Sequence, residues 1–156
     1  METKPKLGTY GYRFGLIAAG TSIVFSLMLY FMDMTYNQSP IIQAFNVLIP
    51  TTLAVLAIVN FKKDNQGLLS LKQSIKMGVG VFLVTGIIGL FYFAIFINVI
   101  EPDFVTNTAQ LQAETLRETN PELGEDVIQM QQDYTEKFFY MSFPFILIMN
   151  VIIGLL

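Results

Sequence analysis

The sequence contains no cysteine and no histidine. Their absence removes the commonest zinc and haem ligands, the thiol nucleophile and the side chain that most readily carries protons near neutral pH. No serine lies in a nucleophile-elbow pattern, and no glycine-rich loop matches a phosphate-binding motif. The sequence therefore predicts a protein that is not an enzyme, with no catalytic residue, no cofactor and no metal site.

Charged side chains are also scarce. They make up 13% of the 156 residues, whereas 53% of the residues are hydrophobic; a soluble domain carries roughly 25% charged residues. Much of the surface must therefore face something other than water. Nine basic residues against twelve acidic ones give a net charge of -3, so the cationic surface that binds a phosphate backbone is lacking. No nucleic-acid partner is expected.

Four apolar stretches cover most of the chain: residues 14–32, 41–61, 77–100 and 138–156. None of them contains a charged side chain. About 20 apolar residues cross a hydrocarbon core of about 30 Å as a helix, and runs this long do not fit the short strands of a membrane barrel. The sequence therefore predicts an all-α integral membrane protein, with residues 1–156 forming a single domain of four transmembrane helices in a lipid bilayer. Because no Lys or Arg flanks the fourth stretch at Leu156, we expect the native chain to continue beyond it.

The basic residues predict the orientation. Seven of the nine lie on one side of a four-helix topology and two on the other, and the positive-inside rule places the richer side in the cytoplasm. The N-terminus and the 62–76 loop are therefore expected to be cytoplasmic, and the acidic segment 101–137 extracytoplasmic. The seven are Lys4, Lys6, Arg13, Lys62, Lys63, Lys72 and Lys76, and the two are Arg117 and Lys137.

Aromatic residues near the ends of the stretches predict two interfacial belts. The outer belt would contain Tyr30, Tyr36, Phe138, Phe139 and Tyr140, and the inner belt Tyr10, Tyr12 and Phe61.

The loop from Gly67 to Lys76 alternates apolar and polar residues at helical spacing. Leu68, Leu71 and Ile75 would share one face of a short interfacial helix that runs into the third span. The alternative is a basic loop that sets topology and binds nothing.

Segment 101–137 predicts an acidic helical hairpin between the third and fourth spans. Pro102 ends the third helix, and Asp103 is placed to cap a helix that runs to about Thr119. Asn120 and Pro121 then break the chain, with Pro121 expected in the first turn of the next helix.

The second helix of this hairpin is expected to run directly into the fourth span, because Val127, Met130, Tyr134 and Phe138 follow at spacings of three, four and four. The composition of the whole hairpin is too polar for an independent core. We therefore expect it to lie on the membrane surface or to bind a partner.

Uncharged polar residues within the spans form a candidate intramembrane polar site. Gln43, Asn46 and Pro50 share one face of the second helix, and Pro50 cannot donate to the carbonyl of Asn46. Asn98 and Asn150 are the other candidates; Asn46 and Asn98 lie at similar depth and would be able to meet. The alternative interpretation is that these amides hold helices together through interhelical hydrogen bonds.

Small residues mark the predicted helix-packing faces. Gly11, Gly15 and Ala19 recur every four positions in the first helix, and Ser74, Gly78 and Gly86 share a face of the third. Their spacing leaves open whether the contacts form within one chain or between copies.

Four features of the sequence are informative in combination: Leu71-Lys72-Gln73-Ser74-Ile75-Lys76-Met77-Gly78, Tyr92-Phe93, Ile100-Glu101-Pro102-Asp103-Phe104 and the Gln- and Glu-rich segment before the last span. Together they resemble an uncharacterised family of small bacterial four-helix inner-membrane proteins that is known only as a domain of unknown function. The resemblance extends over essentially the whole chain and implies a bacterial inner (cytoplasmic) membrane and a four-helix arrangement. It implies no activity.

Two hypotheses of function follow. The first is a noncatalytic membrane protein that binds an extracytoplasmic protein partner or forms a homo-oligomer, through the acidic hairpin and the small-residue helix faces. The alternative is a small transporter or channel with a polar site near Asn46 and Pro50. A coupled carrier usually needs an intramembrane charge, which the four stretches lack.

Overall fold

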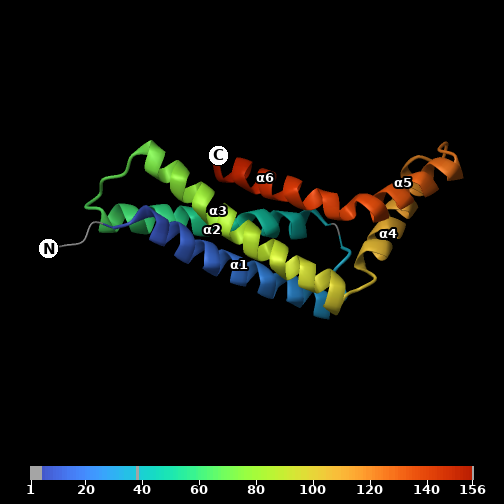
Figure 1. The fold of residues 1–156 in the computed structure, drawn as a ribbon, viewed down its shortest axis with the longest axis horizontal. Coiled ribbons are helices and arrows are strands. Elements are labelled where there is room, and N and C mark those ends of the chain that lie inside the picture. The colour runs from blue at the N-terminus through green and yellow to red at the C-terminus, as the bar shows by residue number, and fades with distance from the viewer. Residues whose placement is uncertain (1–4, 38, 156) are drawn as a thin grey trace. The chain divides into compact units, whose positions relative to one another are not determined.

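The structure is a computed structural model that describes residues 5–37 and 39–155 (Figure 1). Every element of regular structure in these ranges is helical. The elements are α1 (Leu7–Phe31), α2 (Pro40–Asp64), α3 (Leu71–Ile95), the π-helix η1 (Phe96–Ile100), α4 (Phe104–Thr119), α5 (Glu125–Phe138), the 3-10 helix η2 (Phe139–Met141) and α6 (Ser142–Leu155).

Four helical runs are long and apolar enough to cross a membrane, as the sequence predicted. They are Leu7–Phe31, Pro40–Asp64, Leu71–Ile100 and Glu125–Leu155, with 25, 25, 30 and 31 residues. Each run is longer than the ~20 residues that a hydrocarbon core requires. Compared with the predicted spans, each run also extends further at one end or both. Lys4, one of the basic residues used for the orientation, and Leu156, the predicted end of the fourth span, lie outside the described residues.

The chain divides into two compact units. The first comprises Met1–Phe91 with Ile146–Leu156, and the second comprises Tyr92–Phe145. The boundary falls inside the third and fourth helical runs, where the hydrophobic pattern is uninterrupted. Spacing of apolar residues alone does not reveal this division.

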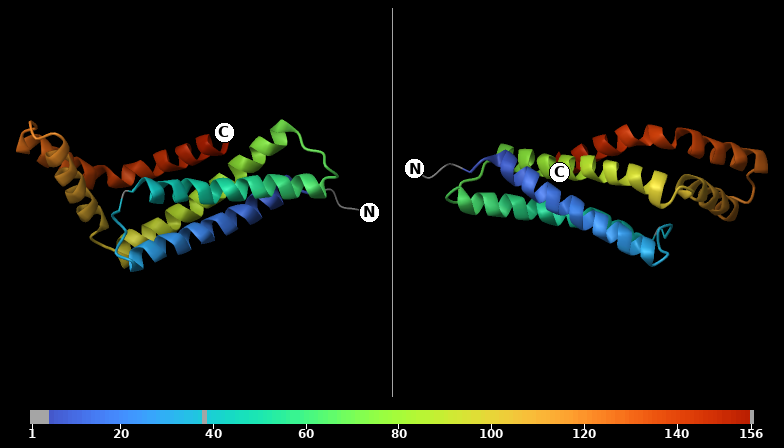
Figure 2. Two further views of the ribbon diagram at one scale, coloured as in Figure 1. Left: turned by 180° about the vertical axis from the view of Figure 1, so that it is seen from behind. Right: turned by 60° about the horizontal axis from the view of Figure 1, so that its bottom comes forward.

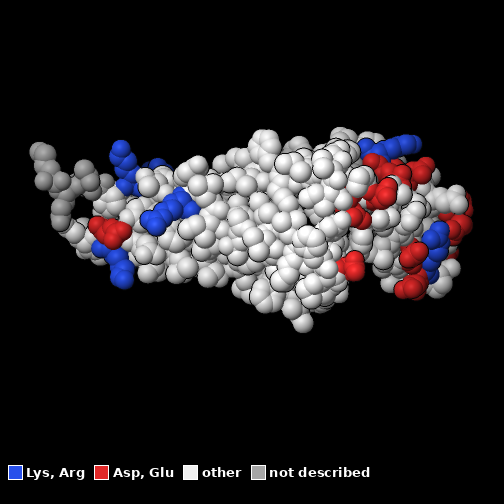
Figure 3. Space-filling model, turned by 90° about the horizontal axis from the view of Figure 1, so that it is seen from below, with Lys and Arg blue, Asp and Glu red and all other residues white. Residues whose placement is uncertain are grey.

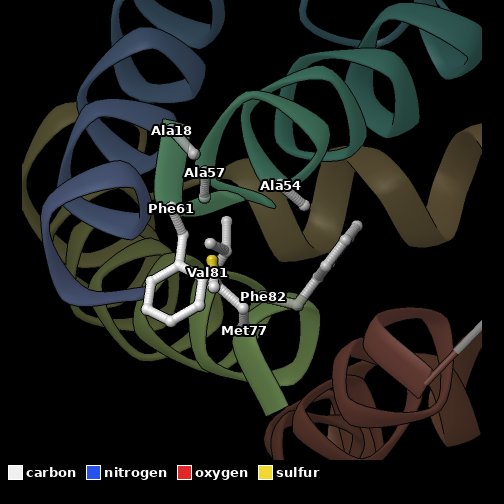
Figure 4. Close-up of a cluster of buried hydrophobic side chains, with 7 residues drawn as sticks. All are labelled: Ala18, Ala54, Ala57, Phe61, Met77, Val81 and Phe82. Carbon is white, nitrogen blue, oxygen red and sulfur yellow. The ribbon is translucent and has the colours of Figure 1, made fainter. Parts of the chain in front are cut away.

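In the first unit, α1 and α2 lie side by side and run in opposite directions (Figure 2). Ser39 begins α2 by accepting a hydrogen bond from the Ile42 amide at 3.4 Å, and Pro40 occupies the first helical position, where a missing N–H costs nothing. A core of buried side chains from α1, α2 and α3 joins these helices (Figure 4). It consists of Ala18, Ala54, Ala57, Phe61, Met77, Val81 and Phe82.

Apart from Asp33, which follows the end of α1, the charged side chains of the first unit gather at the end where α1 begins and α2 ends, and a white, uncharged surface lies beyond them (Figure 3). Lys62 and Lys63 lie in the last turn of α2. At the same end, the Tyr10 hydroxyl donates to the Asp64 carboxylate, and the Tyr10 ring packs edge-on against Phe61 with centroids 5.4 Å apart. Phe61 is only 1% exposed, so its predicted place in a lipid-facing belt is wrong.

The predicted interfacial helix begins later than expected. Gly67 has a φ of +80°, in the left-handed region that glycine favours, and α3 starts at Leu71. Leu68 therefore precedes the helix and does not share a face with Leu71 and Ile75. The remaining residues run into the third span without a break, as predicted.

The second unit contains the end of α3 with η1, the α4–α5 hairpin (Phe104–Phe138), η2 and the beginning of α6. The third helical run ends at Ile100, and α4 runs from Phe104 to Thr119, as predicted from Pro102 and Asp103. Asp103 occupies the N-cap position, but its side chain makes no capping hydrogen bond.

Two details of the hairpin differ from the prediction. Pro121 is not in the first turn of α5, because α5 begins at Glu125 after Gly124. The passage from α5 to α6 is not a plain α-helix, since a 3-10 turn over Phe139–Met141 intervenes. Pro144 explains this turn, because it has no N–H to donate to the carbonyl of Tyr140.

Candidate functional site

A cluster of phenylalanine rings forms the base of the α4–α5 hairpin. Phe93 lies at its centre, with ring centroids 5.5 Å from Phe104, 6.1 Å from Phe139 and 5.8 Å from Phe143. Phe96, only 3% exposed, packs edge-on against Phe104 at 5.8 Å. Rings at such distances stabilise one another beyond the area that they bury. The cluster therefore ties the end of α3, the start of α4 and the start of α6 together.

The predicted belt residue Phe139 belongs to this cluster, since it also contacts Phe104 and Phe143. Phe93 and Phe104 come from two segments that carried the family resemblance, but no spacing rule indicated that they would meet. A signal was present in the unusual density of phenylalanine around residues 91–104 and 138–145.

The π-helix η1 sets the exit from the third span. The Glu101 amide donates to the Phe96 carbonyl at 2.8 Å, five residues back, which closes the wide turn. The Phe104 amide then donates to the Glu101 carbonyl at 3.0 Å, and the Asn107 amide to the Asp103 carbonyl at 2.8 Å. The backbone thus reverses within three residues and starts α4 with its Phe104 ring in the cluster.

The hairpin has a core of its own, which corrects the expectation that its composition was too polar for one. Ala109 is 0% exposed, and Ala113 and Ile128 are each 2% exposed. Two alanines one turn apart on α4 let the α5 backbone approach closely, so that one isoleucine fills the space between the helices. The Thr135 hydroxyl also donates to the Gln112 side-chain oxygen across the pair at 3.3 Å.

An ion pair joins the two helices of the hairpin near their connecting loop. The Arg117 guanidinium donates to the Glu125 carboxylate, with Nε 3.0 Å from Oε1. These hydrogen bonds hold the pKa of the Glu125 carboxyl below its ordinary value. Both side chains are largely exposed, so water screens the pair and its contribution to stability is small.

Most of the hairpin's carboxylates have no such partner. Within residues 104–138 there are seven carboxylates and two basic residues, and Glu125 is the carboxylate that forms a salt bridge. Red side chains accordingly gather over the hairpin in Figure 3. Across the described parts of the chain, no three acidic side chains gather closely enough to hold a metal ion. The remaining six carboxylates are Glu114, Glu118, Glu122, Asp126, Asp133 and Glu136.

A shallow hollow lies between α4 and α5 beside the aromatic cluster. Its lining offers amide and hydroxyl groups along with aromatic rings, and no charged group. It provides hydrogen-bonding positions but no acid, base or activated nucleophile. The lining residues are Gln112, Gln131, Tyr134, Thr135, Phe138, Phe139 and Ser142.

The candidate polar residues of the spans lie on three helical elements, α2, η1 and α6. Gln43 and Asn46 are exposed on α2, while Pro50 is buried. The Asn150 side chain donates to the Ile146 carbonyl of its own helix at 2.9 Å and packs over Gly86. Asn98 belongs to the second unit and donates to the Ala94 carbonyl at 2.7 Å. The Asn46 to Asn98 contact stays a prediction.

The small residues of α1 lie against α3 within the chain. A Cβ added to Gly11 would lie 3.5 Å from the Gly80 Cα, and one added to Gly15 would lie 2.7 Å from the Val84 Cβ. Ala19 is 1% exposed. The spacing left open whether these small residues pack within one chain or between copies; the structure shows close contacts within the chain.

The small residues of α3 lie against α6 in the same way. A Cβ on Gly78 would come within 2.7 Å of the Gly154 carbonyl oxygen, and one on Gly86 within 3.2 Å of the Asn150 side chain. Ser74 takes no part in these contacts; its hydroxyl donates to the Ser70 carbonyl at 3.3 Å, one turn back.

One buried polar residue escaped the sequence reasoning. Thr85 is 8% exposed, and its hydroxyl lies 2.8 Å from the Val81 carbonyl of α3 and 3.2 Å from the Gly15 carbonyl of α1. The single hydroxyl proton serves one carbonyl at a time, so the interhelical bond is the weaker alternative. The position of Thr85, one residue before Gly86 and on the face that carries Gly78, could have indicated that it is buried.

Four apolar helical runs, small-residue contacts between them and a polar hairpin define a multi-pass helical membrane protein. The chain belongs to the family described as protein of unknown function DUF4199, whose model matches residues 13–156. Comparison with curated proteins and with solved structures gives no significant match. The family resemblance noted in the sequence is thereby confirmed, and no activity comes with it.

Proposed function

We propose that this protein is a noncatalytic membrane protein that binds a partner protein through the α4–α5 hairpin. The observation that carries the proposal is the surplus of exposed carboxylates on a hairpin with its own core. Six of seven carboxylates lack a salt bridge within residues 104–138. A folded surface of one charge sign attracts a complementary surface and speeds the encounter with it.

The charge favours a cationic partner over a second copy of this chain. With seven acidic and two basic residues, the hairpin carries a net charge of -5 between residues 104 and 138, so two hairpins repel each other. The glycine-bearing helix faces that were candidates for self-assembly also pack within the chain. Gly11 and Gly15 of α1 lie against α3, and Gly78 of α3 lies against α6. A homo-oligomer would need another surface.

The orientation belongs to the same proposal. Basic residues at the end where α1 begins favour a cytoplasmic N-terminus, which directs the hairpin to the extracytoplasmic side of a bacterial inner membrane. A partner would then be an extracytoplasmic protein or the exposed domain of another membrane protein.

The proposal is tested by neutralising the hairpin without deleting it. The full chain with Glu114→Gln, Glu118→Gln and Glu122→Gln should lose a stoichiometric partner that copurifies with the unaltered chain at low salt. Asp33→Asn is the matched control, because Asp33 is an acidic residue of the first unit and asparagine tolerates its φ of 54°. An unchanged set of copurifying proteins and an unchanged oligomeric state, both for this variant and after deletion of residues 107–132, would contradict the proposal.

One observation supports the alternative of a small transporter or channel. Asn60, Asn98 and Asn150 each donate to the carbonyl four residues back, at 2.8, 2.7 and 2.9 Å. Asn46 makes no such bond among the described residues, and Pro50 supplies no amide to the Asn46 carbonyl. An amide without a partner within an apolar stretch marks a place where a polar solute or water gains hydrogen bonds.

Because the chain has no cysteine, Asn46→Cys tests this alternative directly in intact membranes. Labelling by a membrane-impermeant thiol reagent would indicate a water-filled path, and Asn150→Cys would show whether the path continues deeper. Asp126→Cys serves as the accessible control. Protection of both intramembrane positions, with the control labelled, would contradict the transporter.

A further inference from the structure

Helix α5 has three distinct faces. One packs against α4 through Ile128, which is 2% exposed, and Thr135, which bonds Gln112. A second carries the exposed carboxylates Asp126 and Asp133. The third is apolar and exposed. We call this third face, together with its continuation into η2 and α6, the apolar stripe. It consists of Val127, Met130, Tyr134, Phe138, Met141 and Phe145.

The apolar stripe continues through η2 into α6 at spacings of three and four residues. All six of its side chains are exposed, from 44% for Phe138 to 69% for Met141. The Tyr134 and Phe138 rings stack along it with centroids 4.9 Å apart. A contiguous apolar face of this kind is unfavourable in water and marks an interaction surface.

The continuation of the stripe into the fourth span indicates what covers it. Its last two residues, Met141 and Phe145, lie in the apolar stretch that spans the membrane, so lipid chains cover them. The helical run Glu125–Leu155 has 31 residues, or about 46 Å at 1.5 Å per residue. A hydrocarbon core of about 30 Å in a bilayer of roughly 40–45 Å leaves about 5–8 Å of headgroup layer on each side, so the α5 part stays in that layer only when it leans along the lipid surface. Aromatic side chains such as Tyr134 and Phe138 concentrate in that layer.

Charge disfavours a second copy as the occupant. Asp126 and Asp133 flank the stripe, and two α5 helices joined through it would bring these carboxylates together. The same carboxylates give no attraction to anionic lipids, so burial of apolar area is the driving force.

We infer that the apolar stripe of α5 is immersed in the interfacial layer of the bilayer, so that α5 lies against the lipid surface and the hairpin's acidic faces point to water. The inference goes beyond the proposed function, because it holds whether or not a partner binds. It also leaves the acidic faces, and not the stripe, for that partner.

The test uses the absence of tryptophan from the chain. Met130→Trp places a single indole on the stripe, and Gln129→Trp places one on the neighbouring water-facing side of the same turn. Both full-length variants are reconstituted in phosphatidylcholine vesicles, with and without acyl-brominated phosphatidylcholine, and titrated with iodide. Tyr134→Trp repeats the stripe measurement with a conservative aromatic change, in case Met130→Trp perturbs folding, and Met141→Trp gives the signal of a lipid-covered position.

We expect the stripe variants to emit at shorter wavelength than Gln129→Trp, to be quenched by brominated lipid and to resist iodide, while Gln129→Trp behaves in the opposite way. Adding anionic lipid should not strengthen the effect. Equal iodide quenching at both positions without bromine quenching would overturn the inference, because the stripe would then be in water. Shielding from iodide without bromine quenching would also overturn it, since protein would then cover the stripe. A failure here leaves the copurification result for the glutamate variants untouched, so the two proposals are tested separately.

Discussion

The two units of this protein hold their helices together by different means. In the first, glycines bring backbones into contact beside the buried side-chain core, as between Gly11 and Gly80 or Gly78 and Gly154. In the second, five phenylalanines and the small core of Ala109, Ala113 and Ile128 join the elements. Lipid chains are as apolar as leucine, so helices within a bilayer gain from close packing more than from burial of large side chains. The hairpin carries a polar and charged surface, and apolar burial such as that of Ile128 stabilises a helix pair whose acidic faces are hydrated.

Removing the central ring should affect the second unit most. Phe93→Ala deletes a ring that contacts Phe104, Phe139 and Phe143, and we expect a loss of about 3 kcal/mol, near the low end for such truncations. Hydrogen exchange of the full chain in lipid nanodiscs should then show faster exchange throughout residues 104–138. Phe91→Ala is the control, because Phe91 is 71% exposed. Equal protection of the hairpin in both variants would show that the aromatic cluster does not hold it.

Adding one methyl group should disturb the first unit to a smaller extent. A Cβ at Gly78 would meet the Gly154 carbonyl oxygen at 2.7 Å, and backbone cannot move aside as a flexible side chain can. We expect Gly78→Ala to cost about 2 kcal/mol, within the range for overpacking. Unfolding by titration with denaturing detergent measures the loss.

Gly89→Ala is the matched control for this change. It lies on the same helix with nothing within 4 Å of its added Cβ, and alanine favours the helix over glycine. This variant should be as stable as the unaltered chain or more so. Equal destabilisation by both substitutions would refute the glycine contact between α3 and α6.

The smallest expected effect concerns the buried hydroxyl of Thr85. Thr85→Val keeps the shape and removes the hydrogen bond that alternates between the Val81 and Gly15 carbonyls, so we expect a loss of about 0.6 kcal/mol, the average for interhelical bonds in membranes. Thr51→Val is the control, since Thr51 donates at 2.7 Å to the Val47 carbonyl of its own helix and is exposed. The same detergent titration, read as the difference between the two variants, isolates the interhelical part. A difference of zero would assign the Thr85 hydroxyl to its own helix alone.

Local signals foretold the hairpin only in outline. Pro102 and Asn120 gave the ends of α4 correctly, because proline and the residues around it restrict the backbone whatever packs nearby. Pro121 misled, because a proline suits either the first turn of a helix or a loop before it, and α5 begins only after Gly124. The spacing of Val127, Met130, Tyr134 and Phe138 correctly indicated one helix face, but that face turned out to be exposed while Ile128 is buried.

The sequence by itself determined that four helices cross a membrane and that basic and acidic residues separate along the chain. Both follow from the bilayer, which requires about 20 apolar residues per span and excludes charge whatever the neighbours are. Only the tertiary structure decided that Gly15 meets Val84 and that Phe93 meets Phe104, Phe139 and Phe143. These contacts join residues from different helices, and helical periodicity specifies which face a residue occupies but not which helix lies against that face.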